Sequence, residues 1–185
     1  MWQLDCRKFR PIELAEYRSH LDENRPVVIY IHGNRMSSDE IITRSSKVRH
    51  LIRRRCDAGP IDWVIFSWPA QKEALGLRDF RIKAERTDAQ GLYLASFLRP
   101  HAEASIPLAM IGYSFGARVA TGALHALAGG GLAGRQLPGE PMQNAKVSVG
   151  LVAPAIESSW LGCCGYHRNA TKNMDRLVLL YNRRD

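Results

Sequence analysis

A serine between two glycines is the strongest chemical signal in this sequence. Ser114 has Gly112 two positions before it and Gly116 two positions after it, and an apolar run over residues 106–111 precedes the motif. In a nucleophile elbow, a serine on a tight strand-to-helix turn needs such glycines because larger side chains would clash. The pattern predicts a serine that attacks acyl groups, and the alternative is an ordinary glycine-bounded turn, since five-residue patterns also occur by chance.

The segment after Ser114 is predicted to be a helix that begins at the serine. Its apolar residues fit one helical face, and they are Val119, Ala120, Ala123, Leu124 and Leu127. A helix in this position directs unpaired backbone N–H groups and the positive end of its dipole at negative charge on a substrate oxygen.

The rest of the chain alternates between predicted strands and predicted helices. Four further apolar runs are predicted to be strands, at residues 26–31, 61–66, 147–152 and 176–181. Helices are expected over residues 37–56 and 77–98, and Pro100 is expected to end the second. This alternation predicts an α/β fold with a mostly parallel sheet flanked by helices on both faces. The segment from Trp160 to Asn173 receives no assignment.

One domain is expected over residues 1–185, with a core over 26–185 and an extension over 1–25 that supplies an edge strand at 2–9 and a helix. The formal net charge is +8, but the basic residues are scattered without aromatic interleaving, so nucleic-acid binding is not expected. The sequence shows no signal peptide and no membrane span, which favours a cytoplasmic protein. The oligomeric state is not readable from the sequence.

Three motifs at strand ends resemble those of the α/β-hydrolase superfamily. They are His32-Gly33-Asn34, Phe66-Ser67-Trp68-Pro69 and Gly112-Tyr113-Ser114-Phe115-Gly116. Their order and spacing over residues 26–185 are similar to those of uncharacterised bacterial serine hydrolases of the esterase or lipase type.

The resemblance implies a role for each matching residue. Ser114 would be the nucleophile, and the backbone N–H groups of Phe115 and Asn34 would form the oxyanion hole. Gly112 and Gly116 would support the turn. His32 and Gly33 would shape the loop that carries Asn34.

The sequence offers a candidate for the acid of the expected triad but no histidine in the position expected for the base. In the superfamily the acid follows a strand beyond the nucleophile, a place that Asp185 takes here, with Glu157 as the alternative. The base should follow the acid, yet all histidines precede Asp185, and His167 is the alternative base. We therefore expect a last strand, a last helix and a histidine-bearing loop beyond residue 185, and we expect the 185-residue chain to be nearly inactive.

The predicted function is hydrolysis of a carboxylic ester or related acyl bond in a small-molecule substrate, through an acyl-enzyme on Ser114. Neither a metal nor an organic cofactor is expected. The alternative is a hydrolase-like binding protein without activity. Cys6, Cys56, Cys163 and Cys164 lack metal-ligand spacing, and adjacent cysteines rarely form a disulfide, so reduced thiols are expected. The fold leaves the substrate open.

Overall fold

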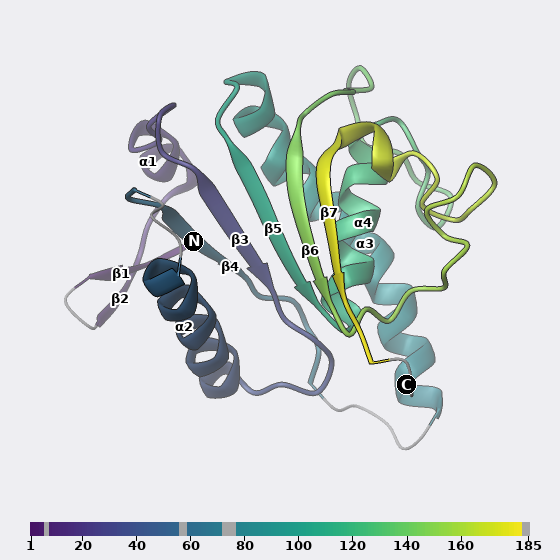
Figure 1. The fold of residues 1–185 in the computed structure, drawn as a ribbon, viewed down its shortest axis with the longest axis horizontal. Helices are drawn as coiled ribbons and strands as arrows, with labels where there is room; N and C mark the ends of the chain where they lie inside the picture. Colours follow the sequence, from purple (N-terminus) through teal and green to yellow (C-terminus); the bar gives the residue numbers. More distant parts are fainter. Residues whose placement is uncertain (6–7, 56–58, 72–76, 183–185) are drawn as a thin grey trace.

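A five-stranded parallel sheet forms the centre of the molecule (Figure 1). The computed structural model describes residues 1–5, 8–55, 59–71 and 77–182. The sheet strands are β3 (Val27–Ile31), β4 (Asp62–Phe66), β5 (Leu108–Tyr113), β6 (Val147–Val152) and β7 (Met174–Leu180). They lie in the order β4-β3-β5-β6-β7, and every neighbouring pair is parallel. This arrangement confirms the predicted α/β fold.

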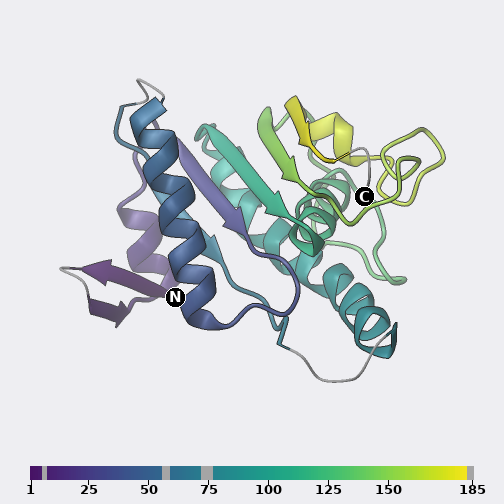
Figure 2. The same cartoon turned by 60° about the horizontal axis from the view of Figure 1, so that its bottom comes forward.

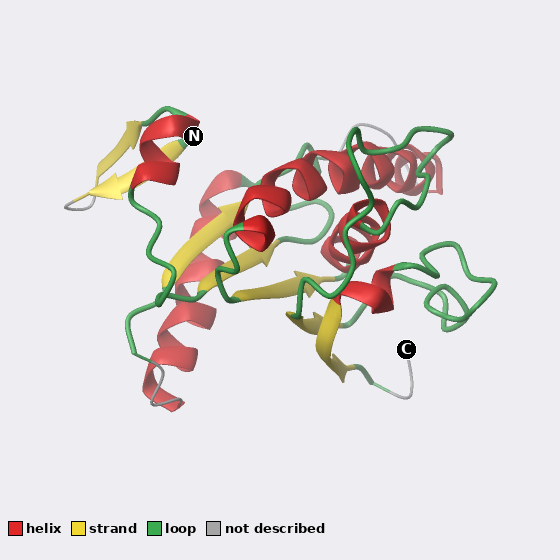
Figure 3. Ribbon diagram, turned by 90° about the horizontal axis from the view of Figure 1, so that it is seen from above, coloured by secondary structure: helices red, strands yellow, loops and turns green. Residues whose placement is uncertain are grey.

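Helices lie against both faces of this sheet (Figure 3). One face is covered by α2 (Ser38–Arg55), whose Ser45 Oγ accepts a hydrogen bond from the Trp63 indole N–H of β4 at 2.7 Å. The other face carries α3 (Leu77–Glu103) and α4 (Phe115–Leu127). In the described part of the chain, no helix combines the length and apolarity that a bilayer span requires.

Burial of α4 extends around the whole helix, whereas the sequence predicted a single apolar stripe. All residues from Phe115 to Leu127 except Arg118 are buried. α4 contacts β3 and β5 of the sheet, and it also contacts α3 and the 3₁₀ helix over Ala170–Asn173. A Cβ on Gly91 of α3 would lie 3.3 Å from the backbone of Gly122, so glycine allows the two helices to approach closely. This second contact surface was not predicted because small residues such as Gly122 do not add to an apolar stripe in the sequence.

The prediction that Pro100 ends the helix expected over residues 77–98 was wrong. α3 continues through Pro100 to Glu103, although proline removes one helical hydrogen bond. The last turn is anchored by the buried side chain of His101. Its Nδ1 lies 2.8 Å from the carbonyl oxygen of Phe97, and its Nε2 lies 3.0 Å from the hydroxyl of Tyr17. The contact with Tyr17 ties the last turn of α3 to the N-terminal segment, which supports the helix beyond the proline.

The N-terminal residues form a separate hairpin, not the edge strand that the sequence predicted over residues 2–9 (Figure 2). β1 (Trp2–Asp5) pairs with β2 (Lys8–Pro11) in an antiparallel sheet of two strands. Neither strand pairs with the main sheet. The short helix α1 (Leu14–Ser19) follows, as predicted.

β7 is an edge strand with apolar side chains open to solvent on both faces. Leu177, Val178, Leu179 and Leu180 are between 37% and 59% exposed. A continuous apolar run is typical of parallel strands that are covered on both faces. β7 therefore has the composition of an interior strand in the position of an edge strand. The unassigned segment before it forms successive turns and the 3₁₀ helix η1 (Ala170–Asn173).

Candidate active site

Ser114 occupies the sharp turn between β5 and α4. Its backbone has φ 52° and ψ −117°, a sparsely populated conformation that costs about 1–3 kcal/mol in a residue other than glycine. Its N–H donates to the Val152 carbonyl at 3.0 Å, and its carbonyl accepts from the N–H groups of Ala117 at 3.0 Å and Ala155 at 3.1 Å. Bonds from β6, from α4 and from the loop after β6 therefore hold the strained turn in place.

The two glycines of the motif lie where no side chain fits. A Cβ on Gly116 would lie 2.2 Å from the carbonyl oxygen of Ile31, and a Cβ on Gly112 would lie 2.8 Å from the Cα of Ala117. Both obstacles are backbone atoms, which cannot rotate away. Gly116 therefore lets the start of α4 press against the end of β3, and Gly112 lets the turn fold back on β5.

The loop after β3 lies directly beside Ser114. A Cβ on Gly33 would lie 3.2 Å from the Cβ of Ser114. The next residue, Asn34, has a side-chain amide whose nitrogen and oxygen are both buried and have no hydrogen-bond partner among the described residues. Buried polar atoms without partners are rare in folded proteins, so this amide is suited to contact a bound molecule.

His32 uses both ring nitrogens to hold that loop. Its Nδ1 donates to the Gly33 carbonyl at 2.8 Å, and its Nε2 accepts the Trp68 backbone N–H at 3.0 Å. The imidazole also stacks on the Trp68 indole, which donates its own N–H to the His32 carbonyl at 2.8 Å. Burial lowers the pKa of His32 and keeps the ring neutral. His32 thus ties the loop after β3 to the loop after β4.

Phe115 is the first residue of α4, so its N–H has no preceding helical carbonyl to bond. Its ring packs against Phe80 of α3, with 5.9 Å between the ring centroids. The start of α4 and the loop that carries Asn34 therefore both adjoin Ser114.

Five of the six histidines are engaged elsewhere or lie far from Ser114. His32 is bonded to backbone at both nitrogens. His50, His101 and His125 lie in the later turns of α2, α3 and α4, which run from the carboxyl edge of the sheet back toward its amino edge. His20 follows α1 and precedes β3, so it also lies toward the amino edge.

His167, the alternative base, packs against the middle of α4. Its Nδ1 lies 2.8 Å from Thr121 Oγ1, and the Thr121 hydroxyl donates to the Ala117 carbonyl at 2.9 Å, so Nδ1 carries the proton. Thr121 is seven residues beyond Ser114, or about 10 Å along the helix axis. Burial, aided by His125 and Arg118, lowers the pKa of His167 to about 3. The fold does not bring His167 to Ser114.

The two candidate acids do not complete the site in the described part of the chain. Asp185 lies outside the described residues. Glu157 is exposed in the loop after β6. Across the described ranges, no group of three or more His, Cys, Asp or Glu side chains is arranged to hold a metal ion.

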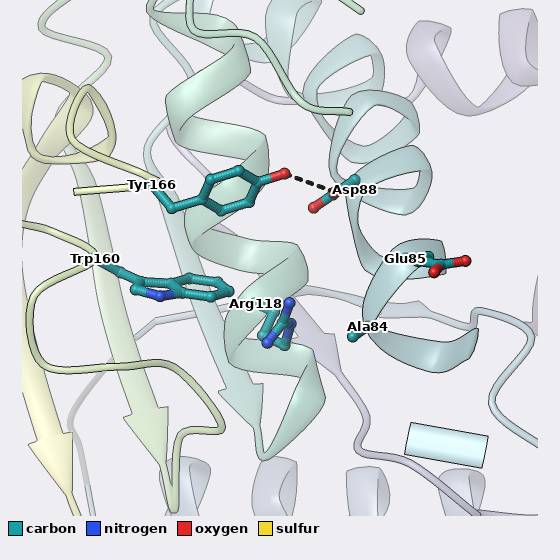
Figure 4. A pocket seen from close by; sticks show the side chains of 6 residues that line it. All are labelled: Ala84, Glu85, Asp88, Arg118, Trp160 and Tyr166. Carbon is teal, nitrogen blue, oxygen red and sulfur yellow. Dashed lines mark hydrogen bonds between the residues drawn. The ribbon is translucent and has the colours of Figure 1, made fainter. Parts of the chain in front are cut away.

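A surface hollow of about 340 Å³ lies beside the first turns of α4, where the sequence showed no motif (Figure 4). It is lined by Ala84, Glu85, Asp88, Arg118, Trp160 and Tyr166. The Arg118 guanidinium lies 4.3 Å from the centroid of the Trp160 ring, and Tyr166 donates its hydroxyl hydrogen to Asp88 at 2.7 Å. Arg118 is one helical turn beyond Ser114, which is the only sequence signal that connects this hollow to the serine.

A protein-family model matches most of the chain. The family model described as "Alpha/beta hydrolase of unknown function (DUF900)" matches residues 13–185. The matched range covers α1, the whole parallel sheet and the turn at Ser114, and it leaves out the hairpin of β1 and β2. A search of the curated proteins found no significant match.

Backbone strain at Ser114 predicts an unusual order of stability among variants. Ser114→Gly relieves the positive φ and Ser114→Ala keeps it, so the glycine variant should have a free energy of unfolding about 1 kcal/mol higher than the alanine variant. Ser96, exposed within α3, is the control, and there glycine should be about 1 kcal/mol less stable than alanine. Urea denaturation measures the free energy of unfolding of all four variants. If alanine were more stable than glycine at Ser114 as well as at Ser96, Ser114 would be unstrained.

Burial of neutral His167 predicts a loss of stability in acid. Below its ordinary pKa of 6.5 the unfolded chain binds a proton at His167, whereas the folded chain does so only near its pKa of about 3. The free energy of unfolding should therefore fall as the pH drops through this window, by up to about 1.4 kcal/mol per pH unit from this residue. His167→Gln should reduce this slope. An unchanged slope in His167→Gln would refute the assignment.

Proposed function

The chain belongs to this family of α/β hydrolases of unknown function, and we propose that it is a serine hydrolase that cleaves a carboxylic ester or a related acyl bond. The observation that carries the proposal is the backbone of Ser114 at φ 52°, fixed between two glycines that cannot bear side chains. Strained residues persist only where their surroundings enforce them, and they concentrate at active sites. This turn is the nucleophile elbow of the proposal.

In the proposed reaction, the Oγ of Ser114 attacks the carbonyl carbon of the acyl group while a base takes the hydroxyl proton. The backbone N–H groups of Phe115 and Asn34 donate to the oxyanion that forms, and the alcohol then leaves with a proton returned by the base. Water releases the acyl group from Ser114 in the second half of the cycle. Close packing of Gly33 against Ser114 supports this use of the loop after β3.

We assign the base to a histidine beyond residue 185 and the acid to Asp185. Two observations support this assignment. The histidines of the 185-residue chain are engaged by neighbouring groups or lie along helices that lead away from Ser114. β7 has apolar side chains open on both faces, as expected of a strand inside a larger sheet whose two faces are covered by further helices. A loop after a further parallel strand of that sheet would emerge at its carboxyl edge, where Ser114 lies.

A hydrolase-like binding protein is the second candidate. It is favoured because, among the described residues, His32 is held by hydrogen bonds at both ring nitrogens and His167 is bonded to Thr121. The substrate of the leading candidate is a small acyl compound. The buried, unpaired amide of Asn34 would orient a polar group of that compound, because a bound molecule can supply the hydrogen bonds that the chain does not.

A fluorophosphonate probe tests the proposed nucleophile, because it forms a covalent bond with activated serines. The 185-residue chain should react slowly at Ser114, and added imidazole should accelerate the reaction about 10-fold or more by supplying the missing base. Ser114→Ala should abolish the modification, whereas Ser96→Ala, which removes an exposed hydroxyl from α3, should leave the rate unchanged.

Three results would speak against the proposal. Equal modification of Ser114→Ala would exclude Ser114 as the nucleophile. Fast modification without imidazole, lost in His167→Gln, would return the base to His167. No modification with or without imidazole would favour the binding protein.

A further inference from the structure

Cys163 and Cys164 form a pair of thiols that the proposed hydrolase chemistry does not use. Both side chains are exposed, and their Sγ atoms lie 3.7 Å apart. We propose that the two thiols together form a binding site for one soft, thiophilic metal or metalloid ion. The proposal is independent of the function assigned to Ser114.

The backbone around the two cysteines is a fixed turn. Gly165 donates its N–H to the Gly162 carbonyl at 2.9 Å, which puts Cys163 and Cys164 at the two central positions of a β-turn. Gly162 in turn donates its N–H to the Ser159 carbonyl at 3.0 Å. A Cβ on Gly165 would lie 2.2 Å from the same carbonyl oxygen, so this glycine is required for the turn to pack as it does.

The turn is also anchored to the protein interior. The His167 N–H donates to the Trp160 carbonyl at 2.9 Å, and the His167 side chain is buried against α4. The Trp160 ring packs on Arg118. Trp160 and His167, which flank the cysteine pair, therefore both contact α4, and these contacts fix the position of the turn. Preorganisation of this kind reduces the entropic cost of binding a ligand through both sulfur atoms.

The separation of the sulfur atoms matches that of two ligands on one metal ion. Two thiolates bound to a tetrahedral ion by bonds of about 2.3 Å lie about 3.8 Å apart. A disulfide between the same atoms would need a bond of about 2.05 Å within a strained ring, so chelation fits the pair better than oxidation. Thiolates select soft ions over hard ones.

The remaining coordination positions of a bound ion would be open. No third His, Cys, Asp or Glu completes a metal-binding group with these cysteines among the residues that the structure describes. The pair lies in a surface hollow of about 500 Å³ whose wall includes Glu157, Ser159 and Trp160. A trivalent arsenical with one organic substituent requires only two thiolates, and it therefore suits this incomplete site.

Phenylarsine oxide is a direct probe for this pair. In the reaction two S–As bonds form, the bond between arsenic and oxygen breaks, and the two thiol protons leave with the oxygen as water. Arsenic stays trivalent, so no oxidant or reductant is required. After reduction and removal of the reductant, the 185-residue chain should gain one phenylarsenic unit in its intact mass. The adduct should survive dilution and an excess of a monothiol, and a dithiol should remove it.

Single variants separate a two-thiol site from independent cysteines. Cys163→Ser and Cys164→Ser should each weaken binding of phenylarsine oxide about 100-fold or more, because the second thiol no longer acts at a high effective concentration. Both positions are exposed, so serine should leave the fold intact. The matched control replaces Cys6 and Cys56 by serine and should keep the adduct. Equal binding by either single variant, loss of the adduct in the control, or absence of an adduct in the reduced chain would overturn the proposal.

Discussion

The close approach of α4 to the end of β3 is the constraint on which the candidate active site depends. Gly116 has no room for a side chain against the Ile31 carbonyl, and this contact fixes where the helix begins. Because β5 must turn into α4 at that point, Ser114 is forced to a positive φ. The geometry of the proposed nucleophile is therefore a consequence of how a helix and a strand pack, and it does not need a bound ligand to form.

The burial of α4 provides the stability that offsets the strained turn. Full burial of one large aliphatic side chain contributes about 1.5–3 kcal/mol, whereas the strain at Ser114 costs about 1–3 kcal/mol. Val119, Leu124 and Leu127 of α4 are each fully buried, so the helix gains more from packing than the turn loses. On the other side of the serine, His32 and Trp68 join the neighbouring loops through two hydrogen bonds, each between a side chain and the backbone. The site is thus held by rigid elements on both sides.

The sequence predicted those parts of the fold that depend on local patterns. The strands of the main sheet are mostly apolar, and the turn at Ser114 has its own glycine spacing. The continuation of α3 through Pro100 was not predictable, because it depends on contact between His101 and Tyr17, which are 84 positions apart. The unpaired amide of Asn34 and the hollow at Arg118 were also hidden, since each arises from segments that meet only after folding. The acid and the base of the proposed triad remain predictions.

The central claim is that Ser114 forms a covalent acyl-enzyme. The most direct measurement uses the protein as its native source makes it, mixed with excess p-nitrophenyl acetate and quenched in acid during steady turnover. Mass analysis of its peptides then locates any acetyl group. We predict one acetyl group per molecule on the peptide that contains Ser114. Turnover of the ester without an acetyl group on that peptide, or with the acetyl group on another residue, would contradict it.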